Sequence, residues 1–309
     1  MKEIIHQITN FVSAQKKGHW LLILIFCSCS VYINYGLGLQ TYFNQLGGTK
    51  EYLSYVMLYA IHSLFAFLSY SFFYKNFKFW KQIGFVVLLF SSFLIFAFRA
   101  TLYQQYDLIE DLSVEGQIRI NQFVFNDVFR LLYLFIPITI IWFVMDRKDK
   151  PLYGLTFKNH KPKVYFKLLL IMLPLIALAS CLSDFLDYYP RVHILTLLNP
   201  PSWKLWLYEI FYGMDFIAIE LFFRGFLIIG FVRYVGINSV LPMACFYLSI
   251  HFGKPFGEAI SSFFGGIILG VISFHSGSIF GGIMVHAGIA WLMEIGGTIG
   301  NFFKTQWLE

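Results

Sequence analysis

Charged residues are scarce in this chain of 309 residues. They make up 13% of it, where a soluble domain usually carries about 25%, and the mean hydropathy is +0.66. A shortfall of this size argues against one water-soluble domain with a polar surface. Long apolar runs must account for it, and a helix needs about 20 apolar residues to cross a hydrocarbon core roughly 30 Å thick.

Cysteine is also rare, and its pattern excludes several kinds of site. The four cysteines all lie in apolar segments: Cys27, Cys29, Cys181 and Cys245. A zinc site of the paired-cysteine type needs a second pair, which does not follow Cys27-x-Cys29. We therefore find no support for structural zinc, disulfides or cysteine catalysis. The first apolar run leads into further ones, so we expect a signal anchor and not a cleaved signal peptide.

Apolar runs of spanning length are what the sequence does contain. They predict an all-α protein, a polytopic transmembrane helical bundle of about eight or nine spans. The last three spans are short and rich in glycine, and one of them could be re-entrant. The predicted spans are 20–39, 52–74, 82–103, 122–145, 164–186, 205–233, 237–252, 257–275 and 278–296.

The connections between these runs carry charge in an alternating pattern. Two are basic, one with Lys75, Lys78 and Lys81 and one with Arg147, Lys148, Lys150, Lys158, Lys161 and Lys163. The connection between them is acidic, with Asp107, Glu110, Asp111 and Glu115. Cytoplasmic loops of membrane proteins are the basic ones. We therefore interpret the net charge of +6 as orientation and not as nucleic-acid binding. The pattern predicts an integral protein of the bacterial cytoplasmic membrane with a cytoplasmic N-terminus.

Four parts are expected along the chain. Residues 1–19 form an amphipathic segment, which would lie on the membrane surface as a helix or else be a plain cytosolic tail. Its apolar stripe consists of Ile4, Ile5, Ile8, Phe11 and Val12. An N-terminal transmembrane bundle follows over 20–145. A basic cytoplasmic loop over 146–163 then precedes a core over 164–309.

Ionisable residues inside the later spans are the candidates for chemistry, since each costs roughly 2.5–3.5 kcal/mol to insert at the membrane centre. Glu220 and Arg224 are four residues apart, so they share a helix face and can form an ion pair, which would equally serve a purely structural role. Asp215 lies one turn before Ile219. Asp127 and Arg130, in an earlier span, are expected to pair locally.

Two histidines add to this set. His251 and His286 fall on two of the last three predicted spans, and a buried histidine alone is more often a hydrogen-bonded core residue than a catalyst. Together with a carboxylate, histidines can activate water or hold a metal ion. Glu220, His251 and His286 are therefore also the candidate ligands of a divalent metal such as zinc. Five glycines should allow close helix packing around them: Gly265, Gly266, Gly270, Gly281 and Gly282.

Three short motifs carry a resemblance to a known family. The run Ile-Glu-Leu-Phe-Phe-Arg-Gly at 219–225 resembles the Glu-Glu-x-x-x-Arg motif of the CAAX-protease and bacteriocin-processing (CPBP, Abi-type) family of intramembrane proteases. Tyr247 and His251 are similar to its second motif, an aromatic residue followed four residues later by histidine. His286 begins a segment similar to its third motif, His-x-x-x-Asn. The resemblance covers about residues 205–300.

The resemblance implies an intramembrane endopeptidase that hydrolyses a membrane-associated peptide or a prenylated protein. In the family, the first Glu and the second-motif His are taken to activate water, while the third-motif His and Asn stabilise the oxyanion. Here the first Glu is Ile219 and the Asn is Ala290. An isoleucine cannot take a proton from water, and an alanine side chain cannot donate a hydrogen bond.

These replacements leave three interpretations. Asp215 or Glu294 could return a carboxylate to the site, Glu220 could serve as the base with His251, or the protein could be a non-catalytic pseudoprotease acting as a membrane scaffold or immunity-type protein. A transporter with a proton relay is disfavoured because no paired repeats are visible. We predict an enzyme in which Glu220 and His251 activate water, with Asp215 as a possible substitute. The remaining predicted roles are His286 at the oxyanion and Arg224 as an organiser of its span through Glu220.

Overall fold

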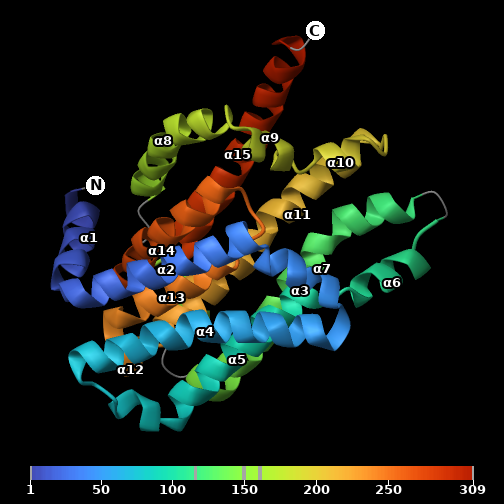
Figure 1. Cartoon of the computed structure of the whole chain (residues 1–309). Helices are drawn as coiled ribbons and strands as arrows, with labels where there is room; N and C mark the ends of the chain where they lie inside the picture. The colour runs from blue at the N-terminus through green and yellow to red at the C-terminus, as the bar shows by residue number, and fades with distance from the viewer. Residues whose placement is uncertain (1, 115–116, 148–150, 159–161, 308–309) are drawn as a thin grey trace. The chain divides into compact units, whose positions relative to one another are not determined.

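The structure, a computed structural model, describes residues 2–114, 117–147, 151–158 and 162–307. Every regular element in these ranges is a helix, so the predicted all-α class is confirmed (Figure 1). Four of the charged residues used to predict topology lie outside the described ranges: Glu115, Lys148, Lys150 and Lys161.

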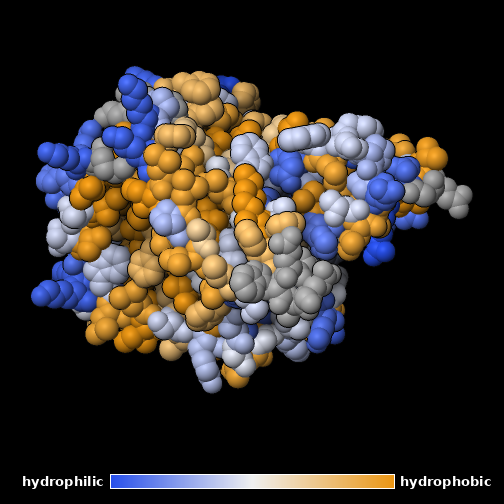
Figure 2. All heavy atoms as spheres, turned by 90° about the horizontal axis from the view of Figure 1, so that it is seen from above, coloured by the Kyte–Doolittle hydropathy of each residue, from blue (hydrophilic) through white to orange (hydrophobic). Residues whose placement is uncertain are grey.

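Seven helices in the described ranges are long and apolar enough to cross a membrane. They are α2 (Lys17–Leu37), α4 (Gly48–Tyr74), α5 (Ile83–Thr101), α7 (Ile118–Ile141) with its π-helical continuation η2 (Trp142–Asp146), α8 (Pro162–Ala179), α14 (Phe256–Ser276) and α15 (Phe280–Trp307). Hydrophobic side chains predominate on the face drawn in Figure 2. The chain is an integral membrane protein.

Two predicted spans take a different form. The one over 205–233 is built from α11 (Ser202–Glu220) followed in the chain by the π-helix η4 (Leu221–Ile229). The one over 237–252 begins within the 3-10 helix η5 (Gly236–Ser239) and otherwise contains only α13 (Val240–Ser249), whose ten residues are all buried. A helix of that length extends about 15 Å, half of the hydrocarbon thickness, so α13 is a short helix enclosed by protein.

The remaining elements are short. They are α1 (Lys2–Ala14), α3 (Leu39–Leu46), η1 (Lys78–Lys81), α6 (Gln104–Asp111), η3 (Leu152–Gly154), α9 (Ser183–Tyr188), α10 (His193–Thr196), α12 (Val232–Val235) and η5 (Gly236–Ser239).

The chain divides into two compact units, each assembled from separate stretches of sequence. Unit 1 consists of residues 1–101, 137–160 and 221–279, and unit 2 of residues 102–136, 161–220 and 280–309. The unit boundaries fall inside α7 and between α11 and η4. The predicted division into an N-terminal bundle and a C-terminal core stays a prediction.

The short helix α13 lies at the centre of unit 1, where it contacts α4, α14 and η4. Aromatic rings fill this core, and Tyr59 of α4 stacks on Phe246 of α13 with ring centroids 4.8 Å apart. A Cβ atom placed on Gly270 of α14 would lie 2.9 Å from Ile228, so close packing of helices at this glycine is confirmed. Gly265 does not serve that purpose, because a Cβ there would meet nothing within 4 Å.

The predicted N-terminal helix is α1, which contacts α14 within unit 1. Phe11 is buried, whereas Ile5 and Val12 remain exposed. One edge of the apolar stripe therefore packs against protein and the other is left uncovered. Its placement on the membrane surface stays a prediction.

The segment 151–158, part of the predicted basic loop, is anchored to unit 1 by a buried tyrosine. The side chain of Tyr153 is fully buried, and its hydroxyl donates to Asp146 Oδ2 at 2.6 Å. Asp146 also forms an ion pair with Arg233. Burial raises the pKa of Tyr153 well above its usual value, and so does the bond to Asp146. The phenol therefore stays protonated and keeps donating.

Tyr153 also explains the glycine that ends the first motif. A Cβ on Gly225 of η4 would lie 2.7 Å from the Tyr153 carbonyl oxygen, which is closer than such atoms come. The segment is fixed at a second point, because the amide of Ile279 donates to the Gly154 carbonyl at 2.9 Å. The hydroxyl of Ser278 also donates to the Thr156 carbonyl.

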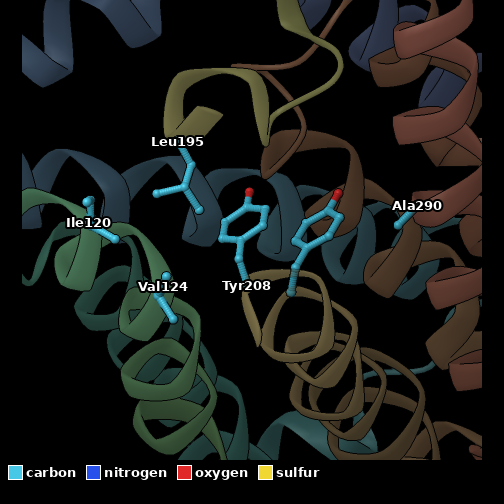
Figure 3. Close-up of a cluster of buried hydrophobic side chains, with 6 residues drawn as sticks. Ile120, Val124, Leu195, Tyr208 and Ala290 are labelled. Atoms are coloured by element: carbon cyan, nitrogen blue, oxygen red, sulfur yellow. The ribbon is translucent and has the colours of Figure 1, made fainter. Parts of the chain in front are cut away.

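In unit 2, α15 contacts α8, α9 and α11, and Figure 1 shows α8 alongside the long α15. Glycines of α15 receive side chains of α8: Tyr165 lies against Gly281 and Leu169 against Gly288. A further cluster joins Ile120 and Val124 of α7 to Leu195, Tyr208, Tyr212 and Ala290 (Figure 3).

Candidate functional site

The helices α11 and α15 run antiparallel in unit 2, and three contacts fix their register. Glu220 lies at Gly282, where an added Cβ would come within 2.0 Å of Oε2. One turn back along α11, the ring of Phe216 lies 4.4 Å from that of His286. A further turn back, Gly213 receives Trp291. These steps place a carboxylate and a histidine on facing helices.

Glu220 and His286 form a hydrogen-bonded pair. His286 Nδ1 lies 3.0 Å from Glu220 Oε1, and the Glu220 side chain is fully buried. A carboxylate is an acceptor only, so it holds the proton of a neutral imidazole on Nδ1 and leaves a lone pair on Nε2. When Nε2 gains a proton, the carboxylate stabilises the resulting imidazolium. The pair can therefore accept a proton at Nε2 and give it back.

Arg224 and His251 belong to unit 1, where both contact Tyr247. The Arg224 guanidinium lies 4.4 Å from the Tyr247 ring centroid, and its residue is only 1% exposed. His251 Nδ1 lies 2.8 Å from the Tyr247 carbonyl oxygen. A carbonyl is also an acceptor only, so neutral His251 carries its proton on Nδ1 and a lone pair on Nε2.

The chain around His251 is held by α2. Tyr35 donates its hydroxyl to the carbonyls of His251 and Lys254, and the amide of Asn34 donates to the Phe252 carbonyl. These bonds fix the turn that follows α13. Neither α2 residue stands out in the sequence as functional, because their partners lie more than 200 residues away.

The two replaced family positions are both buried. Ile219 is 6% exposed, and Ala290 is 4% exposed within the apolar cluster of Figure 3. Asp215 is buried one turn before Ile219 on α11. Glu294 accepts hydrogen bonds from the backbone amides of Arg191 and Val192 at 3.0 and 3.2 Å. Its carboxylate therefore caps that segment, which disfavours Glu294 as the replacement carboxylate.

A comparison with protein-family models bears on these residues. Residues 201–292 match the model described as type II CAAX prenyl endopeptidase Rce1-like. This Rce1-like segment contains all three motifs, from Ile219 to Ala290, so the resemblance seen in the sequence is confirmed over it. No curated protein and no solved structure matches the chain.

The predicted residues of the Rce1-like segment are shared between the two units. Asp215, Glu220 and His286 belong to unit 2, and Arg224 and His251 to unit 1. Within unit 2 the structure brings Glu220 to His286, a pairing across 66 residues. The ion pair between Glu220 and Arg224 stays a prediction. The predicted local pair of Asp127 and Arg130 is confirmed at 3.7 Å.

The donor set for a metal ion is incomplete in unit 2. Glu220 and His286 supply two donors there, and no group of three His, Cys, Asp or Glu side chains within the described ranges could hold a metal ion. His251 belongs to unit 1, so the predicted ligand set of Glu220, His251 and His286 stays a prediction, and we derive no chemical step through a metal.

Two residues of α11, one charged and one aromatic, have contacts that the sequence did not predict. Lys204 is buried and donates to Gln117 Oε1 at 2.9 Å and to Asn121 Oδ1 at 2.7 Å, which ties α11 to α7. Phe216 packs on the His286 ring. A lysine directly before the predicted span over 205–233 was the available signal for the first, whereas Phe216 is one aromatic among many.

Proposed function

We propose that this chain is an intramembrane endopeptidase of the CAAX-protease type, hydrolysing a peptide bond in a membrane-associated peptide or prenylated protein. The observation that carries the proposal is the pair of buried Glu220 and partly buried His286 within the Rce1-like segment. Burying a carboxylate and an imidazole is costly without a partner. Their mutual hydrogen bond pairs Glu220 Oε1 with His286 Nδ1 and creates a group that can exchange a proton.

The proposed reaction uses His286 Nε2 as the proton acceptor. Nε2 takes a proton from water as the water oxygen bonds to the carbonyl carbon of the substrate. The same proton passes to the amide nitrogen as the C–N bond breaks, which yields a carboxylic acid and an amine. Proton transfer by a positioned general base such as His286 contributes about 10²–10⁴ in rate. Glu220 holds the imidazole and stabilises its charged form.

This assignment modifies the prediction from sequence, which placed His286 at the oxyanion and gave water activation to Glu220 and His251. Pairing with Glu220 makes His286 itself a base. His251 also has a lone pair on Nε2, so it stays a candidate base. Asp215 and Arg224 stay candidates for a carboxylate substitute and a structural organiser.

The test is terminal-peptide proteomics on membranes from cells that make the wild type or a variant at matched levels. His286→Gln should abolish the new cleavage termini that the wild type produces, and Glu220→Gln should reduce them while leaving a hydrogen-bond acceptor for Nδ1. His193→Gln is the control, since His193 is an exposed histidine of unit 2. His251→Gln tests the second candidate base.

Identical termini in membranes with wild type and with folded, abundant His286→Gln would contradict the assignment of His286. If no variant and not even the wild type produced new termini, the endopeptidase proposal would fail. The pseudoprotease interpretation would then replace it, with the chain acting as a membrane scaffold or immunity-type protein.

A further inference from the structure

A groove of about 410 Å³ lies at the beginning of α8 in unit 2. It is separate from the Glu220–His286 pair and has no role in the proposed chemistry. Five of its lining residues come from the first three turns of α8 and one from α15. They are Pro162, Lys163, Phe166, Lys167, Leu170 and Met284.

The groove arises from how α8 packs on α15. Tyr165 packs against Gly281 and Leu169 against Gly288, because neither glycine has a side chain that would block the contact. The adjacent face of α8 is therefore left at the margin of the contact. Phe166 and Leu170 remain about half exposed there, and Met284 closes the side formed by α15.

Two kinds of chemistry meet in this groove. Lys163 and Lys167 are one turn apart, so their ammonium groups lie on the same side of the helix. Phe166 and Leu170 are also one turn apart and form an apolar wall beside them. No carboxylate is among the six lining residues. The groove itself is lined by hydrocarbon, including the stems of the two lysines, and these exposed, flexible side chains can bring their ammonium groups to its edge.

We propose that this groove binds an anionic phospholipid, with the phosphate between Lys163 and Lys167 and an acyl chain along Phe166, Leu170 and Met284. A lipid fits better than free phosphate because most of the lining is apolar. The groove also opens on α8, a helix long and apolar enough to cross a membrane, so lipid is its natural neighbour. Basic pockets between transmembrane helices bind anionic head groups in this way.

The groove shares the helix α15 with the candidate site. Met284 stands on α15 between Gly282, which touches Glu220, and His286. A lipid seated in the groove would therefore contact the turn of α15 that carries the histidine. The binding itself does not depend on the proposed endopeptidase activity.

The test measures lipid binding to the full-length chain purified in detergent, by native mass spectrometry and by thermal stability. The probes are phosphatidylglycerol and phosphatidylcholine with identical acyl chains, and inorganic phosphate alone. Since each lysine contributes about 1 kcal/mol, Lys163→Gln with Lys167→Gln should weaken phosphatidylglycerol binding by roughly tenfold to thirtyfold. Lys78→Gln with Lys81→Gln removes the same charge from η1, where both lysines are exposed, and should change nothing.

Leu170→Ala shortens the apolar wall and should weaken binding of phosphatidylglycerol while leaving the two lysines in place. Equal affinity for the two lipids, an unchanged affinity in the double lysine variant, or full reproduction of the effect by inorganic phosphate would overturn the proposal. Because both lysines are exposed, the double variant should fold. The single variants Lys163→Gln and Lys167→Gln, each with about half the effect in free energy, provide a second measurement.

Discussion

At the scale of single residues, Glu220 shows how an intramembrane carboxylate is accommodated. It is fully buried, yet a histidine on the facing helix forms a hydrogen bond with it. The absence of a side chain on Gly282 leaves room for its second oxygen. The same glycine that lets two helices approach therefore also creates the space for the ionisable pair.

Gly282→Ala should disturb that pair directly. The new methyl group would overlap Glu220 Oε2, so the carboxylate must leave the position in which it bonds to His286. Overpacking of this kind costs about 1–3 kcal/mol of stability, and we expect proteolytic activity to fall by at least about tenfold because the base loses its orienting partner. Activity and thermal stability of the purified variant check this.

Gly265→Ala is the matched control, since its methyl group would meet nothing within 4 Å. A Gly282→Ala protein with the activity of the Gly265→Ala protein would contradict a role for the Glu220–His286 geometry.

The sequence predicts Glu220 and His286 as functional but not their partnership. Helical spacing relates Glu220 to Arg224, four residues on, because periodicity only reports neighbours on the same helix. The structure changes to a π-helix at Leu221. A π-helix has a different number of residues per turn, so residues four apart no longer share a face as they do in an α-helix. The partner observed for Glu220 lies 66 residues away on α15. Such a contact depends on tertiary packing, which no local pattern encodes.

At the scale of elements, the packing of η4 depends on the segment 151–158, which its charged residues alone would indicate to be a loop. Six basic residues dominate the stretch 146–163, but its apolar residues around Tyr153 decide its structure. Tyr153 packs on Phe226 of η4 with ring centroids 5.5 Å apart, and its carbonyl lies over Gly225. The tyrosine in this basic stretch was the available sequence signal, and the net charge of the stretch does not reveal it.

Tyr153→Phe should lower stability by about 1–3 kcal/mol, because it removes a hydrogen bond donated to buried Asp146. Tyr153→Ala should cost about 3–5 kcal/mol, since it also leaves a cavity beside η4. Thermal unfolding in detergent, followed by intrinsic fluorescence, measures both. Phe157→Ala is the control, because that aromatic of the same segment is 70% exposed and should cost little. Equal losses in all three proteins would argue against an anchoring role of Tyr153.

At the scale of the whole molecule, seven helices in the part of the chain that the structure describes fit a membrane by length and composition, while α13 is short and enclosed. Hydropathy predicts the long spans well because each is a continuous apolar run. It cannot separate α13 from a span, since burial in protein and burial in lipid select the same residues. Orientation rests on the charge of the connections.

An N-terminal epitope tag should be resistant to protease in intact spheroplasts and be digested only after lysis. This follows from the cytoplasmic N-terminus that the alternating basic and acidic connections predict. A tag inserted between Leu112 and Ser113, next to the acidic residues of α6, should be digested in intact spheroplasts. The opposite pattern for the two tags would reverse the predicted orientation.

The anchoring of segment 151–158 also has a consequence for how the protein is made. Its partner residues come late in synthesis, since Ser278 and Thr156 are 122 residues apart in the chain. Until the ribosome has passed Ile279, the bonds that Ser278 and Ile279 donate to this segment cannot form, and Tyr153 must wait for η4 before it can be buried. A nascent chain stalled before this point would carry an unanchored basic segment.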